Sequence, residues 1–409
     1  MRGIVPGSPG SDPGPGQGWE GTRGRVAMVV RNPVSGDSRV RKSASALASA
    51  GWDVTVLGTS PDDVEHRLEL DGVPVVLVPV PPVLTGYDRA RVRGGWPEQE
   101  FARWWAARRE LARRDAALRG RGREVRWVHD AHELSAATAD RGVGGLRGLL
   151  RRRMIGGMLA ELVPTADAVV TVSDDLAERL RADLRLPDRP VVVLNAPPVA
   201  SARPAPSLRK RAGVRPEERL LVYAGGLTPA RGVDLAVRAL PELDGVHLAL
   251  VAPDADPHVA GLCALADGLG VGERLHVVPY VAPDQVVDYL AGADAGLVPL
   301  LHRPNHEISL VTKYIEYAQA KLPLVVSDVR VMAAFTREHG LGEVFRVQDG
   351  ARGLADAARA VLSDRLRYRA AYDAAAGVLA RLTWEEQSTV LTGLYEHIAH
   401  AAGSRTPAM

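Results

Sequence analysis

Short apolar segments of strand type alternate with longer helical patterns along almost the whole chain, and this alternation restricts the fold more than any other feature. The first half carries the apolar segments at residues 25–30, 53–57, 75–80, 126–128 and 168–172. The second half repeats them at residues 219–224, 247–251, 275–278, 295–300, 324–327 and 343–347. Because helices that join successive strands produce parallel sheets, the pattern predicts an α/β protein with parallel sheets and crossover helices.

The length of the chain indicates more than one domain. A chain of 409 residues is longer than one hydrophobic core usually organises, so two α/β domains are expected. Residues 195–206 are rich in proline and alanine, which is typical of a linker because proline fixes the backbone and cannot join a central ladder. We therefore predict one domain over residues 25–197 and a second over residues 198–380.

The two ends of the chain have different compositions. Residues 1–24 are rich in glycine and proline and contain no apolar run typical of a signal peptide, so we expect a disordered leader. Helical periodicity at residues 364–380 and 384–400, with Thr383 as an N-cap, predicts helices near the other end, the last forming a bridging helix and tail over residues 381–409.

The composition narrows the classes of function. Hydrophobic residues make up 46% and charged residues 24%, as in a globular protein, and a net charge of +2 favours a charged small molecule over nucleic acid as the partner. The single cysteine, Cys263, excludes an intrachain disulfide and a cysteine-rich zinc site, and we interpret it as a core residue. No apolar segment is long enough to span a bilayer, so the expected compartment is the cytoplasm.

A glycine-rich turn between a predicted strand and a predicted helix is the first candidate binding element. Residues 223–234 (YAGGLTPARGVD) place Gly225 and Gly226 directly after the strand and Arg231 at the start of the helix. Glycines allow backbone to approach a ligand, helix N-termini offer unpaired N–H groups, and arginine can bind a phosphate with two donors. On spacing alone, a tight turn with a solvated arginine explains the segment equally well.

A second candidate element has the order loop, helix, turn and strand over residues 309–327. Lys313 and Glu316 are three residues apart and share one face of the predicted helix near its N-terminus. A lysine suits a diphosphate, and a carboxylate can accept hydrogen bonds from two ribose hydroxyls. The alternative for this helix alone is an ordinary exposed Lys–Glu pair.

Four segments together resemble the glycosyltransferases of family 4, which have the GT-B fold. The segments are residues 32–42 leading to 51–57, residues 129–134, residues 223–234, and residues 309–327 following 293–300. Each is modest alone, whereas their order and spacing are specific. The resemblance implies two Rossmann-like domains facing across a cleft, with the acceptor on the N-terminal domain and the nucleotide sugar on the C-terminal domain.

The resemblance also implies roles for particular residues. Arg231 and Lys313 would contact the diphosphate and Glu316 the ribose, while the base would lie beside the turn at Tyr280 and Val281. The remaining implied donor contacts come from the glycine turn and the start of the second segment: Gly225, Gly226, Ser309 and Leu310.

The chain departs from the family pattern at two positions. Many relatives carry an acid eight residues before the one that matches Glu316, and Ile308 stands there; Glu307, one residue away, could approach the sugar or be a solvated loop acid. A subgroup with a Ser-Leu-x-x-Lys pattern, which residues 309–313 resemble, does without the first acid, and we favour that interpretation. Gly226 replaces a second arginine, so the positive charge would rest on Arg231 and Lys313.

Polar residues follow a strand of the first half at residues 129–134 (HDAHEL). Two histidines with acids allow a metal site, but no third ligand has matching spacing and GT-B enzymes generally need no metal, so we predict none. The resemblance implies that His132 faces the donor sugar and the reacting centre, oriented by Asp130 or with help from Glu133 at the acceptor. The alternative is that one histidine is hydrogen-bonded beneath the sheet.

A turn at residues 35–39 precedes the predicted helix of residues 40–50. Gly36, Asp37 and Ser38 lie in this turn, where backbone N–H groups and the serine could contact sugar or acceptor. An N-cap by Asp37 or Ser38 is the simpler interpretation, and the two roles are compatible.

The resemblance implies a retaining hexosyltransferase with a nucleoside-diphosphate sugar, UDP-sugar favoured, as co-substrate and no other cofactor. The acceptor class stays open among small molecules, glycans and lipid-linked sugars. In place of catalytic side-chain nucleophiles, we expect His132, Arg231 and Lys313 to act on the sugar and the leaving diphosphate. A GT-B phosphorylase or epimerase, or a catalytically silent GT-B binding module, are the rival interpretations.

An arginine-rich segment lies between the first and second of these four segments. Residues 89–126 contain twelve arginines together with Trp96, Trp104 and Trp105, a composition that would suit an anionic membrane surface. Intervening acids dilute the charge, so a solvated helix is an equal alternative. Peripheral contact with the inner face of the membrane is therefore one expectation.

Overall fold

The computed structural model describes residues 23–62, 64–79, 126–134, 145–198, 204–253 and 256–403, which form two compact units. The units comprise residues 1–81 and 82–409. The predicted leader lies almost wholly outside the described residues, as do residues 89–125 of the arginine-rich segment.

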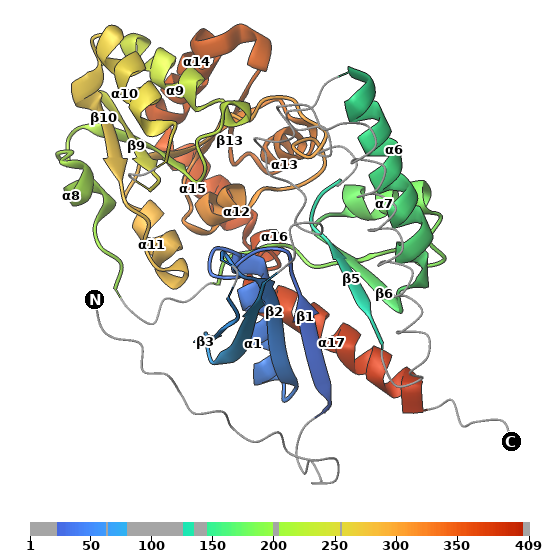
Figure 1. Cartoon of the computed structure of the whole chain (residues 1–409). Coiled ribbons are helices and arrows are strands. Elements are labelled where there is room, and N and C mark those ends of the chain that lie inside the picture. Colours follow the sequence, from blue (N-terminus) through green and yellow to red (C-terminus); the bar gives the residue numbers. More distant parts are fainter. Residues whose placement is uncertain are drawn as a thin grey trace, which may run out of the picture. The chain divides into compact units, whose positions relative to one another are not determined.

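The first unit is built on a four-stranded sheet with one principal helix (blue in Figure 1). Its elements are β1 (Arg25–Val29), α1 (Ser38–Ser49), β2 (Asp53–Thr59), β3 (His66–Leu70) and β4 (Val73–Val78). The strand order is β1-β2-β4-β3, with β1, β2 and β4 parallel. Strand β2 buries alternate residues such as Val54 and Val56, and α1 contacts it through a face that includes Leu47.

Strand β3 was not predicted, and it runs antiparallel to β4. The two strands are joined by Asp71 and Gly72, whose φ angles are 54° and 77°. Two consecutive residues with positive φ produce the tight hairpin turn for which Asp-Gly is a preferred sequence. The dipeptide therefore carried a hairpin signal that the search for apolar runs did not use.

The second unit contains a six-stranded, entirely parallel sheet. Its strands are β8 (Arg219–Ala224), β9 (Val246–Val251), β10 (Leu275–Val278), β11 (Ala295–Val298), β12 (Leu324–Ser327) and β13 (Gly342–Phe345). The strand order is β10-β9-β8-β11-β12-β13. The chain begins at the central strand β8 and adds β9 and β10 on one side. It then returns to the centre with β11 and adds β12 and β13 on the other side. This is the doubly wound order, in which ligands bind where the direction reverses, at the carboxyl ends of the two central strands β8 and β11.

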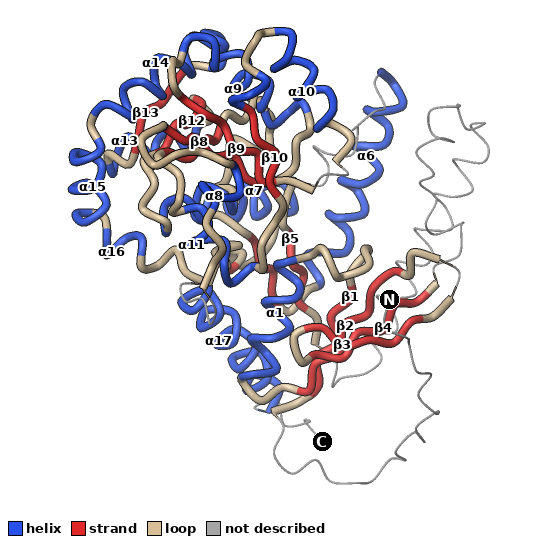
Figure 2. The backbone as a smooth tube through the Cα atoms, turned by 90° about the vertical axis from the view of Figure 1, so that its left-hand side faces the viewer, coloured by secondary structure: helices blue, strands red, loops and turns tan. Residues whose placement is uncertain are grey.

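Helices cover both faces of this sheet, so alternate residues of each strand enter different cores (Figure 2). Leu220 and Val222 pack with helices of one face, whereas Leu221 and Tyr223 pack with helices of the other. The first face carries α8 (Leu208–Ala212), α11 (Val286–Leu290), α12 (Thr312–Gln319) and α13 (Arg330–His339). The second carries α9 (Val233–Ala239), α10 (Val259–Gly268) and α14 (Gly350–Ser363). Burial on both faces explains the continuous apolar strands of the sequence.

A three-stranded parallel sheet completes the second unit. It consists of β5 (Val128–Ala131), β6 (Ala168–Thr171) and β7 (Val191–Val192). Val169 packs in a cluster with α6 (Gly145–Leu162) and α7 (Asp174–Leu184), whereas Val170 packs in a cluster with α17 (Trp384–Gly403). The predicted parallel sheets are confirmed in both halves of the chain.

The helices near the C-terminus follow the predicted pattern with one interruption. The segment predicted as a helix over residues 364–380 is divided into α15 (Arg365–Ala374) and α16 (Ala376–Leu379). The last helix, α17, is capped as expected, since Glu386 N donates to Thr383 Oγ1 at 3.4 Å. Cys263 lies in α10 and is half-buried.

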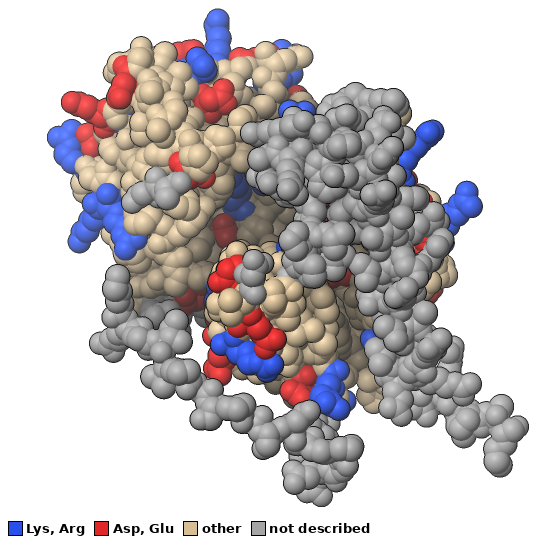
Figure 3. Space-filling view, viewed as in Figure 1, with Lys and Arg blue, Asp and Glu red and all other residues tan. Residues whose placement is uncertain are grey.

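The described surface mixes charges of both signs. On the face drawn in Figure 3, acidic and basic side chains are interspersed, in keeping with the net charge of +2. Among the described residues, no helix combines the length and apolar character that crossing a membrane requires.

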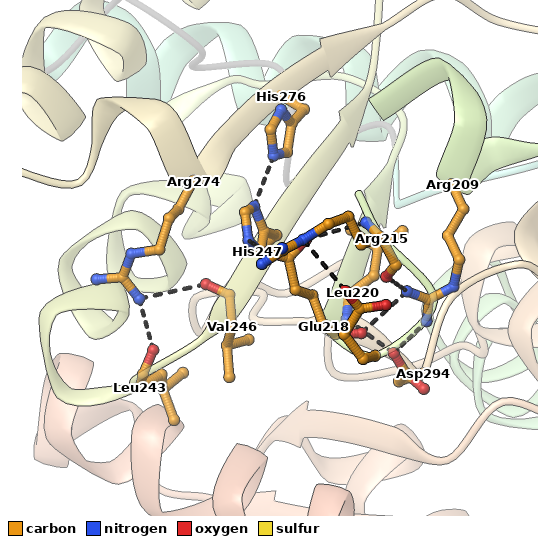
Figure 4. Close-up of polar contacts among 11 residues, drawn as sticks. Arg209, Arg215, Glu218, Leu220, Leu243, Val246, His247, Arg274, His276 and Asp294 are labelled. Carbon is orange, nitrogen blue, oxygen red and sulfur yellow. Dashed lines mark hydrogen bonds and ion pairs between the residues drawn. The ribbon is translucent and has the colours of Figure 1, made fainter. Parts of the chain in front are cut away.

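A polar cluster joins the amino ends of the central strands in the six-stranded sheet (Figure 4). The buried Asp294 carboxylate accepts hydrogen bonds from Leu220 N at 2.8 Å and from Arg209 Nη2 at 2.5 Å. Beside it, His247 Nδ1 and His276 Nε2 are hydrogen-bonded at 2.9 Å, so one nitrogen donates and the other must stay unprotonated. Burial and the neighbouring His247 lower the pKa of His276, while Glu218 raises it.

The histidine pair predicts acid-sensitive stability. Below about pH 6.5, the ordinary pKa of histidine, the unfolded chain binds a proton that His276 in the folded protein resists, so the free energy of unfolding should decrease as the pH falls. In His276→Gln, which can still form a hydrogen bond but cannot titrate, the decrease should be smaller. Thermal denaturation at about pH 7.5 and about pH 5 measures the difference.

The matched control is His397→Gln, the same change at an exposed position on α17. This control should lose as much stability on acidification as the unaltered protein. If His276→Gln behaves like the control, the pair does not govern the acid response.

Candidate functional site

The two candidate binding segments meet at the carboxyl ends of β8 and β11. Gly225 and Gly226 directly follow β8, and residues 299–311 connect β11 to α12. Gly225 has a φ of +113°, a conformation that side-chain-bearing residues rarely adopt, and its N–H donates to Val251 O at 3.1 Å. The doubly wound order of the sheet thus brings both segments to the position where such sheets bind ligands.

The two loops touch through backbone. A Cβ added at Gly232, whose φ is +65°, would lie 2.0 Å from Pro299 O, so glycine is the only residue that fits. Leu301 N also donates to Ala230 O at 3.1 Å. These contacts fix the Arg231 turn, formed by the 3-10 helix η2 (Pro229–Arg231), against the loop after β11.

Lys313 is the most unusual side chain of the site. It is only 8% exposed, and its Nζ has no hydrogen-bond partner among the described residues. The Nζ lies 3.5 Å from the centroid of the Tyr223 ring, and 3.2 Å from the position that a Cβ at Gly225 would take. An isolated buried ammonium is expensive, and a cation over an aromatic face recovers only part of that cost. The ammonium is therefore directed at the glycine turn without a partner that neutralises it.

Arg231 and Glu316 act on Lys313 electrostatically. Burial is the main reason that the pKa of Lys313 is lowered well below its ordinary value; the positive charge of Arg231 lowers it further, and the carboxylate of Glu316 raises it. Arg231 and Glu316 are both half-buried, and Glu316 lies one helical turn after Lys313 on α12. The structure brings the three predicted side chains into one electrostatic group.

Two buried tyrosines hold the glycine turn, and the sequence pattern did not point to their role. Tyr223 Oη donates to Gly226 O at 2.7 Å, and Ala224 N donates to Tyr317 Oη at 2.7 Å. A Cβ at Gly296 would lie 2.6 Å from the Tyr317 ring, so this glycine makes room for the tyrosine. Two features of the sequence could have indicated this contact: a glycine inside a strand, and a tyrosine inside an amphipathic helix.

The other predicted donor residues surround α12. Val281 and Leu310 are partly buried and pack against the hydrophobic core, and Ser309 is half-buried in the loop before the helix. The neighbouring Tyr280 is 49% exposed, and its pKa is raised by burial first and then by the charges of Asp256 and Glu316. The Tyr280 turn therefore lies within electrostatic range of Glu316.

The loop acid Glu307 is engaged on both oxygens. Its carboxylate accepts a hydrogen bond from Arg330 N at 2.8 Å, at the start of α13, and pairs with His302 Nδ1 at 2.6 Å. The hydrogen bond with Glu307 is the main cause of the raised pKa of His302, whose Nε2 pairs with Asp328 at 3.0 Å. Ile308, at the position where relatives carry an acid, packs in the apolar cluster of the three-stranded sheet.

Residues 129–131 belong to β5, which extends further than the strand predicted over residues 126–128, and residues 132–134 follow its carboxyl end. His132 Nε2 is 3.1 Å from Asp130 Oδ2, so this carboxylate can orient the ring and leave Nδ1 for another partner. The pKa of His129 is lowered, and burial is the main cause. Glu133 accepts a hydrogen bond from Asn305 Nδ2 at 3.2 Å.

The turn before α1 belongs to the first unit. Asp37 caps the helix, because its Oδ1 accepts from Val40 N at 3.1 Å, and its Oδ2 accepts from Asn32 Nδ2 at 2.8 Å. Ser38 is the first helical residue, and a Cβ at Gly36 would meet no atom within 4 Å. Of the two N-caps considered from the sequence, the structure has Asp37.

No cluster of three or more histidine, cysteine, aspartate or glutamate side chains suited to a metal ion occurs within the described part of the chain.

Two family models and several curated proteins are similar to this chain. Residues 36–196 match the model described as a glycosyl transferase 4-like domain, and residues 218–364 match the model described as glycosyl transferases group 1. A D-inositol 3-phosphate glycosyltransferase of Mycobacterium marinum is 27% identical over 289 residues, covering 66% of this chain and 59% of that protein. One of Acidothermus cellulolyticus is 28% identical over 424 residues, covering 91% and 90%.

Solved structures with the same architecture cover nearly the whole chain. A sucrose-phosphate synthase from Thermosynechococcus elongatus has a TM-score of 0.68 at 18% identity, covering 92% of this chain and 99% of that one. HepE of Anabaena, in complex with UDP and glucose, has a TM-score of 0.64 at 14% identity with coverage of 92% and 99%. These likenesses show the GT-B fold, and with both family models matched in order along the chain, the protein belongs to family 4 of the glycosyltransferases.

Proposed function

We propose that this protein transfers a hexosyl unit, with retention of anomeric configuration, from a nucleoside-diphosphate sugar to a hydroxyl of an acceptor. A UDP-sugar is the favoured donor. The acceptor is a small molecule, a glycan or a lipid-linked sugar. Residues 198–380 would hold the donor, residues 25–197 the acceptor, and residues 381–409 would form a bridging helix and tail.

The buried Lys313 ammonium is the observation that carries this proposal. An ammonium without a hydrogen-bond partner, aimed at a glycine turn in a doubly wound sheet, is suited to an anion that arrives as ligand. Arg231 adds a second positive charge from the other loop. A diphosphate supplies the negative charge and the acceptor oxygens that this pair lacks.

The same two cations would assist the chemistry. As the bond between the anomeric carbon and the diphosphate oxygen breaks, negative charge grows on the leaving group, and fixed cations stabilise it without reorganisation. The acceptor hydroxyl would attack on the same face, giving its proton to the departing diphosphate. No side-chain nucleophile and no metal ion is part of this proposal.

The neighbouring residues suit the other parts of a nucleotide sugar. Glu316 can accept hydrogen bonds from both ribose hydroxyls, and the Tyr280–Val281 turn would border the base. HepE, whose structure contains UDP and glucose, supports the choice of UDP. His132 Nδ1 would accept a hydrogen bond from a hydroxyl of the donor sugar, with Asp130 orienting the ring.

The experiment for this function is a transfer assay. Purified protein is incubated with UDP-, GDP- and ADP-sugars and a panel of acceptors that includes inositol 3-phosphate, because relatives are named for that acceptor. Proton NMR of the product should show the anomeric configuration of the donor. Cleavage of a glycoside that requires inorganic phosphate would instead support a phosphorylase, interconversion of nucleotide sugars an epimerase, and absence of any turnover a silent binding module.

Replacing Lys313 separates binding from stability. We expect Lys313→Met to weaken UDP binding by about ten- to hundredfold, because a hydrogen bond to a charged group contributes about 1.5–3 kcal/mol. The melting temperature should stay the same or rise, since the variant removes a buried and unpartnered charge. Isothermal titration calorimetry and thermal denaturation measure the two effects.

The control for this variant is Lys321→Met. Lys321 follows the same helix but is exposed and paired with Asp373 at 3.3 Å, so its replacement should leave UDP binding unchanged. UDP binding by Lys313→Met that equals that of the unaltered protein would contradict the assignment.

The lowered pKa of Lys313 also predicts a pH dependence of binding. A bound diphosphate stabilises the charged ammonium and raises its pKa, so UDP affinity should fall as the pH rises through the pKa of Lys313 in the free protein. Above that pH, binding should take up a proton. Titrations in two buffers with different ionisation enthalpies measure this uptake.

Lys321→Met should retain the same proton uptake as the unaltered protein. UDP affinity that is independent of pH, together with no proton uptake on binding, would contradict the prediction.

A further inference from the structure

Asn305 joins two segments that lie 171 residues apart in sequence. Its Oδ1 accepts a hydrogen bond from Leu134 N at 2.8 Å, and its Nδ2 donates one to Glu133 Oε2 at 3.2 Å. Both functional ends of one amide group are thus used on the segment that directly follows His132. Asn305 itself belongs to the loop between β11 and α12.

That loop is attached on its other side to the Arg231 turn. Leu301 N donates to Ala230 O at 3.1 Å, and His306 Nδ1 is hydrogen-bonded to Leu301 O at 2.7 Å. Arg231 is close enough to contribute to the lowered pKa of His306, after the larger effect of burial. Asn305 therefore extends from a loop whose backbone is already held against the cationic part of the site.

Further contacts tie the loop to the three-stranded sheet. Ser173 Oγ, the N-cap of α7, donates to Ile308 O at 2.5 Å. The side chain of Ile308 packs in the same cluster as Ala131 and Leu134. These contacts limit the movement of the backbone near Asn305, so the amide is presented to residues 133–134 in one orientation.

We propose that Asn305 is a positioning residue, which sets the 132–134 segment relative to the Arg231 turn and Lys313. This inference rests on the proposed transfer reaction, in which His132 meets the sugar while the two cations hold the diphosphate. A small displacement between groups that act on neighbouring parts of one substrate reduces turnover strongly. The role of Asn305 is to keep the two groups in register, without contacting the reacting atoms.

The amide is the side chain that satisfies both contacts. Aspartate has the same shape and could still accept from Leu134 N, but its second oxygen would face the Glu133 carboxylate and repel it. Alanine would lose both hydrogen bonds. The two substitutions therefore disturb different halves of the contact.

The test uses Asn305→Asp in two backgrounds of the full chain. In the unaltered background, Asn305→Asp should lower kcat about ten- to hundredfold, while the Kd of UDP stays the same. In the Glu133→Gln background, the amide at position 133 can donate to the new carboxylate, so Asn305→Asp should have little further effect on kcat. An equal loss of kcat in both backgrounds, or no loss in either, overturns the proposal.

Hydrogen exchange of the amides of residues 132–134 gives a reading without turnover. Asn305→Ala should accelerate exchange at Leu134 N–H about tenfold, as expected for loss of one hydrogen bond, whereas Asn305→Asp should leave it protected. Unchanged exchange in Asn305→Ala would overturn the contact itself. The exposed Gln348→Glu, the same amide-to-acid change elsewhere, should alter neither exchange nor kcat.

These readings distinguish the two proposals. If the unaltered protein transfers no sugar but Asn305→Ala accelerates hydrogen exchange at Leu134 N–H, the proposed function fails. The hydrogen bond between Asn305 and Leu134 is then still supported. If transfer occurs and Asn305→Asp loses no kcat, only the role of Asn305 fails.

Discussion

The buried ammonium of Lys313 is the interaction on which the site depends. Moving an ammonium into a protein interior costs on the order of several kcal/mol, and a desolvated cation–π contact such as the one with Tyr223 returns about 2 kcal/mol. Nearby Arg231 increases the cost, and Glu316 reduces it. The free protein therefore favours the neutral amine of Lys313, and an anionic ligand would supply the partner that the charged ammonium needs.

Tight packing on both faces of the sheet supports this arrangement. Tyr223 reaches the glycine turn from a central strand and Tyr317 reaches it from α12. The hydroxyl of each tyrosine forms a hydrogen bond with backbone at or beside the turn. Gly296 and Gly232 are required because any Cβ would collide with Tyr317 or with Pro299 O. A rigid frame of this kind keeps Lys313 in place even though its environment favours the neutral amine.

The loop after β11 differs from the family pattern, and the structure shows how its residues are used. Glu307 caps α13 and pairs with His302, while Ile308 fills an apolar cluster. Both side chains strengthen the attachment of the loop to its surroundings. Asn305, which no motif singled out, then makes two hydrogen bonds to the segment after His132.

The sequence alone determined the parallel sheets, most strand positions, the family, and Arg231, Lys313 and Glu316 as candidates, because apolar periodicity and motif spacing are local properties. It did not determine the β3 hairpin, since that signal was a dipeptide and not an apolar run. Only the tertiary structure decided that Lys313 is buried without a hydrogen-bond partner, that Glu307 caps a helix, and that Asn305 meets Glu133. Each of these three features depends on which backbone group or aromatic ring, distant in sequence, is a neighbour of the side chain. The order of the strands in the folded sheet determines those neighbours.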